Sequence, residues 1–302
     1  MKKPLVSFCL FTYNQEEFIK DALIGAFTQT YSPLEIIVSD DCSSDNTFEI
    51  IQTVVSQYKG EHKVIINRNK TNLGIRKHWN KLTLEIAKGT IIVAAAGDDV
   101  SLPNRVERSV QLFETYPKAM CINSESQLCD KNLQPLNIRK FDKLDAFPSC
   151  LTLKDYFDFQ DFIIFSGDSR VIRREVFEMF GPITKGKDED SVMFVRCLML
   201  GQVCHVRECH VMRRWHGGNV SNVNNTKINI SEFTNPIFAD IEFALTKGYI
   251  TQEIAILLQK KISSVSRILL DSYHKRKNKR CYRWIYELPT NYIRRFKNKV
   301  FK

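Results

Sequence analysis

The sequence predicts an α/β protein with a mainly parallel, doubly wound sheet and a helical C-terminal extension. Short β-type runs alternate with helically spaced apolar residues through the first third of the chain, which is the pattern of strands joined by crossover helices. From residue 231 onward the pattern becomes entirely helical. We therefore divide the chain into an α/β domain over 1–225 and a helical, basic extension over 226–302.

Each expected element follows from its local pattern of apolar residues and breakers. The first expected strands lie at 5–11, 35–39, 64–67 and 90–96, and the expected helices lie at 17–28, 46–58 and 75–87. Further along we expect helices at 104–116, 173–180 and 191–201, and strands at 120–126, 162–165, 169–172 and 202–212. The polar, proline-containing stretch 131–152 is expected to form a surface excursion.

The composition is that of an ordinary globular protein. The 302 residues are 43% hydrophobic and 26% charged, which is sufficient to build a core without covalent staples. The nine cysteines are odd in number and lack C-x-x-C spacing, so we expect reduced core residues rather than disulfides or a zinc site. No stretch approaches the roughly 18 apolar residues of a membrane span. These features favour a cytoplasmic protein.

The formal charge of +10 is concentrated at the C-terminal end. Residues 274–302 interleave lysines and arginines with aromatic and aliphatic side chains. Such a segment can be a solvated basic helix, a peripheral anchor on the anionic inner face of the cell membrane, or a nucleic-acid arm. We favour the first two interpretations and expect no nucleic-acid partner.

Polar residues follow three of the expected strands, where the carboxyl ends of parallel strands form a ligand-binding edge. These groups are Thr12-Tyr13-Asn14, Asp40-Asp41 and Asp98-Asp99. Each group alone could be a turn or a helix cap. Their joint occurrence at one edge favours a binding site.

No glycine-rich phosphate loop of the G-x-G-x-x-G or G-x-x-x-x-G-K-[ST] type occurs, so phosphate must be bound in another way. A divalent cation held by one or two carboxylates and by substrate phosphates suits Asp98-Asp99. A second acidic run, Asp188-Glu189-Asp190, begins an apolar helix. It could simply complement the helix dipole or supply a general base.

Residues 4–47, PLVSFCLFTYNQEEFIKDALIGAFTQTYSPLEIIVSDDCSSDNT, resemble the opening of the family 2 glycosyltransferases. Four further segments follow in the family's order: NLGIRKHWN, GDDVSLPNRVERSV, KDEDSVMFVRCLMLG and RRWHGGNVS. The resemblance covers about residues 4–222. It implies the GT-A fold, an inverting mechanism, a nucleotide-sugar donor such as a UDP-sugar, and Mn²⁺ or Mg²⁺.

The resemblance also implies roles for particular residues. Around the nucleotide it implies that Thr12, Tyr13 and Asp41 contact base and ribose, that Asn14 and Glu16 shape their pocket, and that Arg76 and Arg213 contact the diphosphate. At the reacting end it implies Asp98 as a donor contact, Asp99 and His216 as metal ligands, Asp190 as the general base and Glu189 as its orienting partner. Ala96 stands where many members have a further acid, which places more weight on His216.

The resemblance further implies transfer to a hydroxyl of a glycan or lipid-linked glycan in surface-polysaccharide synthesis, by a single in-line displacement. Two alternatives come from other classes. A glycoside hydrolase also needs paired carboxylates but no metal. A basic nucleic-acid-binding module would use the C-terminal segment and bind any duplex with steep salt dependence.

Overall fold

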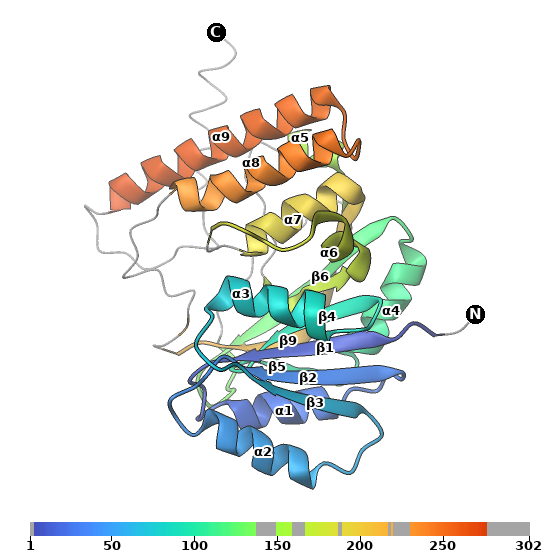
Figure 1. Cartoon of the computed structure of the whole chain (residues 1–302), viewed down its shortest axis with the longest axis vertical. Helices are drawn as coiled ribbons and strands as arrows, with labels where there is room; N and C mark the ends of the chain where they lie inside the picture. Colours follow the sequence, from blue (N-terminus) through green and yellow to red (C-terminus); the bar gives the residue numbers. More distant parts are fainter. Residues whose placement is uncertain are drawn as a thin grey trace.

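The structure is a computed structural model that describes residues 3–136, 149–158, 167–186, 189–216, 219 and 230–276. This part of the chain confirms the predicted class, because a mixed sheet of nine strands lies between layers of helices (Figure 1). Two long helices complete the described part at its C-terminal end. The expected strand at 162–165 falls outside the described residues.

The first four strands run parallel, as the alternation of strands and helices predicted. They lie in the order β3-β2-β1-β4. Their bounds are β1 Val6–Thr12, β2 Leu34–Asp40, β3 Lys63–Arg68 and β4 Ile91–Ala96. The connecting helices are α1 Ile19–Phe27, α2 Thr47–Gln57 and α3 Ile75–Asn80, which continues as a π-helix over Lys81–Ile86.

Beyond β4 the sheet is mixed, and β8 lies antiparallel beside β4. The later strands are β5 Val100–Ser101, β6 Ala119–Cys129, β7 Cys150–Leu151, β8 Val171–Arg173 and β9 Gln202–Arg214. The later helices are α4 Arg105–Thr115, α5 Leu153–Asp158, α6 Arg174–Phe180 and α7 Glu189–Leu200, with a 3₁₀ turn at Gly167–Ser169. Because β8 runs opposite to β4, this turn lies at the carboxyl end of β4.

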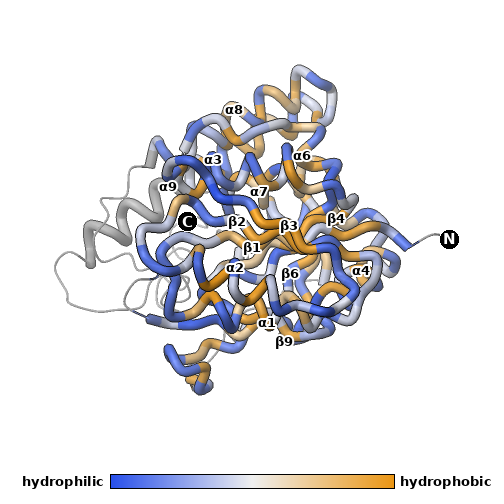
Figure 2. Tube along the Cα trace, turned by 60° about the horizontal axis from the view of Figure 1, so that its bottom comes forward, coloured by the Kyte–Doolittle hydropathy of each residue, from blue (hydrophilic) through white to orange (hydrophobic). Residues whose placement is uncertain are grey.

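The sheet is apolar on both faces, so its central strands are buried throughout. Side chains alternate along a strand: Ile36 and Val38 face the core shared with α1, α2 and α4, whereas Ile37 faces the core shared with α3, α6 and α7. Figure 2 shows the apolar segments gathered along these central strands. The helices of the two layers cover opposite faces of the sheet (Figure 1).

The C-terminal helices α8 Ile230–Thr246 and α9 Gln252–Arg276 pack on the α7 side of the molecule (Figure 1). Ile241 of α8 and Leu258 of α9 belong to the same buried cluster as Phe194 of α7. The buried Arg196 of α7 also forms a bidentate ion pair with Asp240 of α8, at 2.6 and 3.0 Å. The expected boundary at 225/226 and most of the basic segment 274–302 lie outside the described residues.

Within the described part of the chain, none of the helices carries an apolar stretch long enough to cross a bilayer.

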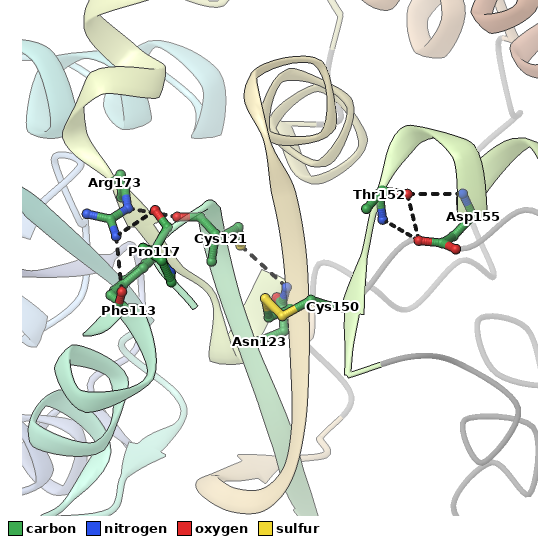
Figure 3. The surroundings of a disulfide bond; sticks show 10 residues. Phe113, Pro117, Cys121, Asn123, Cys150, Thr152, Asp155 and Arg173 are labelled. Carbon is green, nitrogen blue, oxygen red and sulfur yellow. Dashed lines mark hydrogen bonds between the residues drawn. A yellow bond between two sulfur atoms is a disulfide. The ribbon is translucent and has the colours of Figure 1, made fainter. Parts of the chain in front are cut away.

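The expectation that all cysteines are reduced is wrong for one pair. Cys150 and Cys204 form a disulfide, because β7 pairs antiparallel with β9 and places these two residues opposite each other (Figure 3). Their separation of 54 residues leaves no local spacing signal in the sequence. Six other described cysteines are free, namely Cys9, Cys42, Cys121, Cys129, Cys197 and Cys209. Cys281 lies outside the described residues.

Candidate active site

The three expected polar groups converge at one edge of the sheet. The backbone N–H of Asp41 donates to the carbonyl of Thr12 at 2.9 Å, and the N–H of Gly97 donates to the carbonyl of Phe11 at 2.8 Å. These two hydrogen bonds continue the parallel pairing of β1 with β2 and with β4 by one residue beyond the ends of β2 and β4. The loops after β1, β2 and β4 therefore lie side by side, as the sequence predicted.

The loop after β1 is fixed to the turn after β2. Asn14 Oδ1 accepts a hydrogen bond from the Ser44 N–H at 2.9 Å, and Glu16 Oε2 accepts one from the Asn46 N–H at 2.9 Å. Asn14 and Glu16 therefore shape this part of the edge through their own contacts. Tyr13, which directly precedes Asn14, has 45% of its surface exposed, so its ring is accessible to a ligand.

Asp41 is buried, and its carboxylate already accepts several hydrogen bonds. Oδ1 accepts from Asn69 Nδ2 at 2.7 Å and from the Leu73 N–H at 2.9 Å, and Oδ2 accepts from the Gly74 N–H at 2.9 Å. The carboxylate thus positions the loop 69–74 against this edge of the sheet. Its contact with base or ribose remains a prediction.

The paired acids after β4 meet the end of β9. Asp98 Oδ2 lies 3.1 Å from His216 Nε2, and Asp99 Oδ1 accepts the Arg214 N–H at 2.8 Å. Arg214 is fully buried, and it also donates to the Asp98 carbonyl at 2.9 Å and to Asp21 Oδ2 at 2.7 Å. The predicted proximity of His216 to the acidic pair is therefore present in the structure.

Acidic side chains surround Asp99. Burial raises the pKa of its carboxyl well above the usual value, and the neighbouring carboxylates of Asp98 and Asp168 raise the pKa further. The buried Arg105 lies beneath them and donates to the Asp168 carbonyl at 3.1 Å and to the Ala94 carbonyl at 2.7 Å. Burial lowers the pKa of Arg105 to about 10, so it remains charged at neutral pH.

Asp168 was not among the predicted site residues, although it lies in this acidic group. Its side chain is 7% exposed, and among the described residues neither carboxylate oxygen has a hydrogen-bond partner. Nε of Arg213 lies 3.9 Å from Oδ2. Only the topology could have identified Asp168. Because β8 pairs antiparallel with β4, the residues just before β8 lie at the carboxyl end of β4.

The predicted general base, Asp190, lies in the first turn of α7, and its side chain is 41% exposed. Oδ1 accepts a hydrogen bond from Nη1 of Arg170 at 3.0 Å, and Nη1 also donates to the Asp190 carbonyl at 3.1 Å. Arg170 is buried and holds the carboxylate against Gly167. Glu189 beside it is half-buried, and Asp188 lies outside the described residues.

Arg76 lies away from the acidic group in this structure. It lies in the first turn of α3, and its Nη1 donates to the carbonyls of Ile183 and Thr184 at 3.1 and 2.7 Å. Asn80 also exchanges two hydrogen bonds with Ile183, each at 2.9 Å. The two side chains thus hold the segment that leads into α7. Contact of Arg76 with a diphosphate remains a prediction.

The described residues contain no group of three histidine, cysteine or acidic side chains arranged to hold a metal ion. They do contain two partly buried acids after β4, a carboxylate at Asp168 without a hydrogen-bond partner among them, and a raised pKa at Asp99. This arrangement suits a cation that takes one or two protein carboxylates and receives its other ligands from phosphate and water. It does not form a complete protein cage.

A mixed sheet with an acidic pair after β4 and a carboxylate at the start of α7 is the arrangement expected of a GT-A-type glycosyltransferase. The model of the family described as "Glycosyl transferase family 2" matches residues 7–181, which is more than half of the chain. The chain therefore belongs to glycosyl transferase family 2.

Relatives and solved structures agree with this assignment. The putative glycosyltransferase EpsE of Bacillus subtilis is 33% identical over 113 residues, which cover 37% of this chain and 40% of EpsE. Staphylococcus aureus TarS 1-349 in complex with UDP-GlcNAc aligns with a TM-score of 0.65 and 15% identity over 90% of this chain and 74% of that chain. The mannosyltransferase PcManGT from Pyrobaculum calidifontis, in complex with GDP-Man and Mn²⁺, aligns with a TM-score of 0.59 and 15% identity. The alignment covers 99% of this chain and 80% of that chain.

At such low identity the two structures show the fold alone. The chain spans about 40% of the length of the first curated relatives that it matches. Neither the hydrolase nor the nucleic-acid-binding alternative finds support in these comparisons.

Proposed function

We propose that the protein is an inverting glycosyltransferase that moves a sugar from a nucleotide sugar, such as a UDP-sugar, to a hydroxyl of a glycan or lipid-linked glycan. The observation that carries this proposal is the convergence of Asp99, Asp168 and Asp190 from three separate segments onto one edge of the sheet. Family membership supports the reaction class, and the UDP-GlcNAc complex of TarS supports the choice of a UDP-sugar.

The nucleotide is assigned to the loops after β1 and β2. The exposed ring of Tyr13 is available to stack on the base, a contact that contributes roughly 1–3 kcal/mol per base in other proteins. Thr12 and Asp41 lie beside each other at the ends of β1 and β2. The Thr12 hydroxyl is buried and has no hydrogen-bond partner among the described residues. A ligand that offers donors here would satisfy that hydroxyl.

The diphosphate is assigned to the loop after β4. Asp99 is the first candidate to hold Mn²⁺ or Mg²⁺, with His216 and Asp98 at its side. The cation would neutralise charge on the leaving diphosphate, a contribution of several kcal/mol in metal-assisted enzymes. The Mn²⁺ complex of PcManGT supports this choice of cofactor.

Asp190 is assigned as the general base. Its carboxylate takes the proton of the acceptor hydroxyl while that oxygen forms a bond to C1 of the sugar and the bond from C1 to the diphosphate oxygen breaks. The configuration at C1 inverts because the attack and the departure occur on opposite faces. Arg170 keeps the carboxylate in place, and Glu189 is positioned to orient the acceptor or the sugar.

The cellular setting belongs to the same proposal. We assign the enzyme to surface-polysaccharide synthesis on the cytoplasmic side of the membrane, with peripheral contact to anionic lipid through 274–302. The family resemblance and the basic composition of this segment support the assignment. Vesicle flotation of the full chain and of a chain ending at residue 273 tests the membrane contact, and equal flotation of both would remove it.

The catalytic proposal is tested with the full chain, Mn²⁺ and a panel of nucleotide sugars. Wild-type protein should release nucleoside diphosphate, and EDTA should abolish this release. Asp190→Asn should bind the donor with wild-type affinity while turnover falls by roughly 10²- to 10⁴-fold. Glu178→Gln, a neutralised carboxylate that is 61% exposed on α6, is the matched control and should retain wild-type turnover. Substantial transfer by Asp190→Asn would contradict the assignment of the base.

A further inference from the structure

In-line transfer restricts where the donor sugar can lie, and this inference rests on the proposed function. C1 of the sugar must face the leaving diphosphate on one side and the acceptor oxygen on the other. The diphosphate is assigned to Asp99 and the acceptor proton to Asp190. The transferred sugar must therefore lie between these two carboxylates.

The segment that joins these two positions is the 3₁₀ turn Gly167–Ser169. Gly167 lies directly against the carboxylate of Asp190. The carboxylate of Asp168 is near enough to Asp99 to act on its charge. The turn is fixed from below, because Arg105 donates to the Asp168 carbonyl and Ser169 Oγ donates to the Ser124 carbonyl at 2.7 Å. The sugar therefore passes over a rigid turn that carries one acidic side chain.

That side chain has unused hydrogen-bonding capacity. Only 7% of the Asp168 side chain is exposed. Both of its oxygens nevertheless lack a hydrogen-bond partner within the described part of the chain. Arg213 Nε at 3.9 Å is beyond hydrogen-bond distance. A buried carboxylate without hydrogen bonds is costly, and such orphaned groups in native structures mark strained or ligand-binding sites. Four lone pairs can accept hydrogen bonds from adjacent hydroxyl groups.

We propose that Asp168 accepts hydrogen bonds from hydroxyl groups of the transferred sugar and thereby selects the donor sugar. A role as a third metal ligand is the competing explanation. The described residues offer no group of three ligands for one cation, which favours the sugar. The two explanations make different predictions for nucleotides with and without the sugar.

The test compares the affinities of UDP and GDP with those of UDP-glucose, UDP-N-acetylglucosamine and GDP-mannose by calorimetry, all with Mn²⁺. In Asp168→Asn, the Kd of the bound nucleotide sugar should rise by roughly 10- to 100-fold, as expected for lost hydrogen bonds to a charged group. The Kd of the matching nucleoside diphosphate should stay unchanged. Glu178→Gln should change neither value, and thermal unfolding should show that each variant is folded. Asp168→Ser provides a second, smaller replacement.

Deoxy analogues of the nucleotide sugar that binds locate the contact without relying on a variant's stability. Removal of one contacted hydroxyl should weaken binding to the wild type by about the same factor as Asp168→Asn, and should cause little further loss in the variant. Wild-type Kd values for both ligands in Asp168→Asn would overturn the proposal. An equal loss for nucleotide and nucleotide sugar would assign Asp168 to the cation instead. A wild type that binds none of these nucleotide sugars would overturn the proposed function itself.

Discussion

Gly167→Ala should remove the proposed general base, Asp190, from its position without unfolding the protein. An ideal Cβ at Gly167 would fall on the carboxylate of Asp190, and its three nearest heavy atoms all belong to that group. Gly167 does not adopt the left-handed conformation, so alanine is compatible with the backbone. The new methyl group therefore meets the end of the Asp190 side chain and no backbone atom among its three nearest atoms. The Asp190 carboxylate must then leave its place beside Arg170.

The expected magnitude follows from this displacement. Misplacing a reacting group by about 1 Å costs on the order of 100-fold in rate, and losing a general base costs on the order of 10² to 10⁴-fold. We expect kcat to fall by about 100- to 1,000-fold, while the Kd for nucleoside diphosphate and the thermal midpoint remain at wild-type values. Release of nucleoside diphosphate under saturating donor, with calorimetry in parallel, measures these quantities.

A double variant provides the control for this mechanism. If Gly167→Ala acts through the base, the combination with Asp190→Asn should be no slower than Asp190→Asn alone. Losses that multiply in the double variant would refute this reasoning, and so would a kcat of Gly167→Ala within about threefold of wild type, which is far below the loss expected for a displaced base.

The remaining predictions concern stability. Asp240→Ala leaves the buried Arg196 without its ion partner and should lower the free energy of unfolding by about 3–5 kcal/mol, whereas Glu178→Ala in an exposed pair should cost at most about 0.5 kcal/mol in denaturant titrations. Burial lowers the pKa of His78 below 6.5, so the unfolded chain binds its proton more readily, and the free energy of unfolding should fall as the pH decreases below about 6.5. His78→Asn should show a smaller fall between pH 7.5 and 5.5, and an identical fall would contradict this cause. Reduction of the disulfide between β7 and β9 should cost about 4 kcal/mol for the loop that it closes, and an unchanged thermal midpoint in dithiothreitol would argue against its presence.

The sequence was most informative where local patterns determine structure. The apolar runs predicted β1 to β4 within a residue or two, and parallel pairing then required Thr12, Asp41 and Asp98 to meet at one edge. The acidic start of α7 was also predicted from its composition. These predictions succeeded because each depends on the period of a single segment or on a rule for parallel strands.

Features that depend on long-range pairing were missed. Asp168 is recognisable only when β8 is known to lie antiparallel to β4, and the disulfide depends on the register of two strands 54 residues apart. Arg170 lies in a short run rich in arginine that is typical of a surface, yet its side chain is 1% exposed because it pairs with Asp190. Propensity and periodicity do not contain this information, since the burial of a charge depends on its partner.

The shared core of α7, α8 and α9 has a practical consequence for where this enzyme can be divided. The family match ends at residue 181, just before α7. A fragment cut there would keep the loops after β1, β2 and β4 but would lose Asp190, and it would uncover the face of α6 that packs against α7 and α8 in the intact chain. A unit that keeps the proposed base and the core around it therefore extends beyond the region recognised by similarity, and truncations for crystallisation or screening should retain both C-terminal helices.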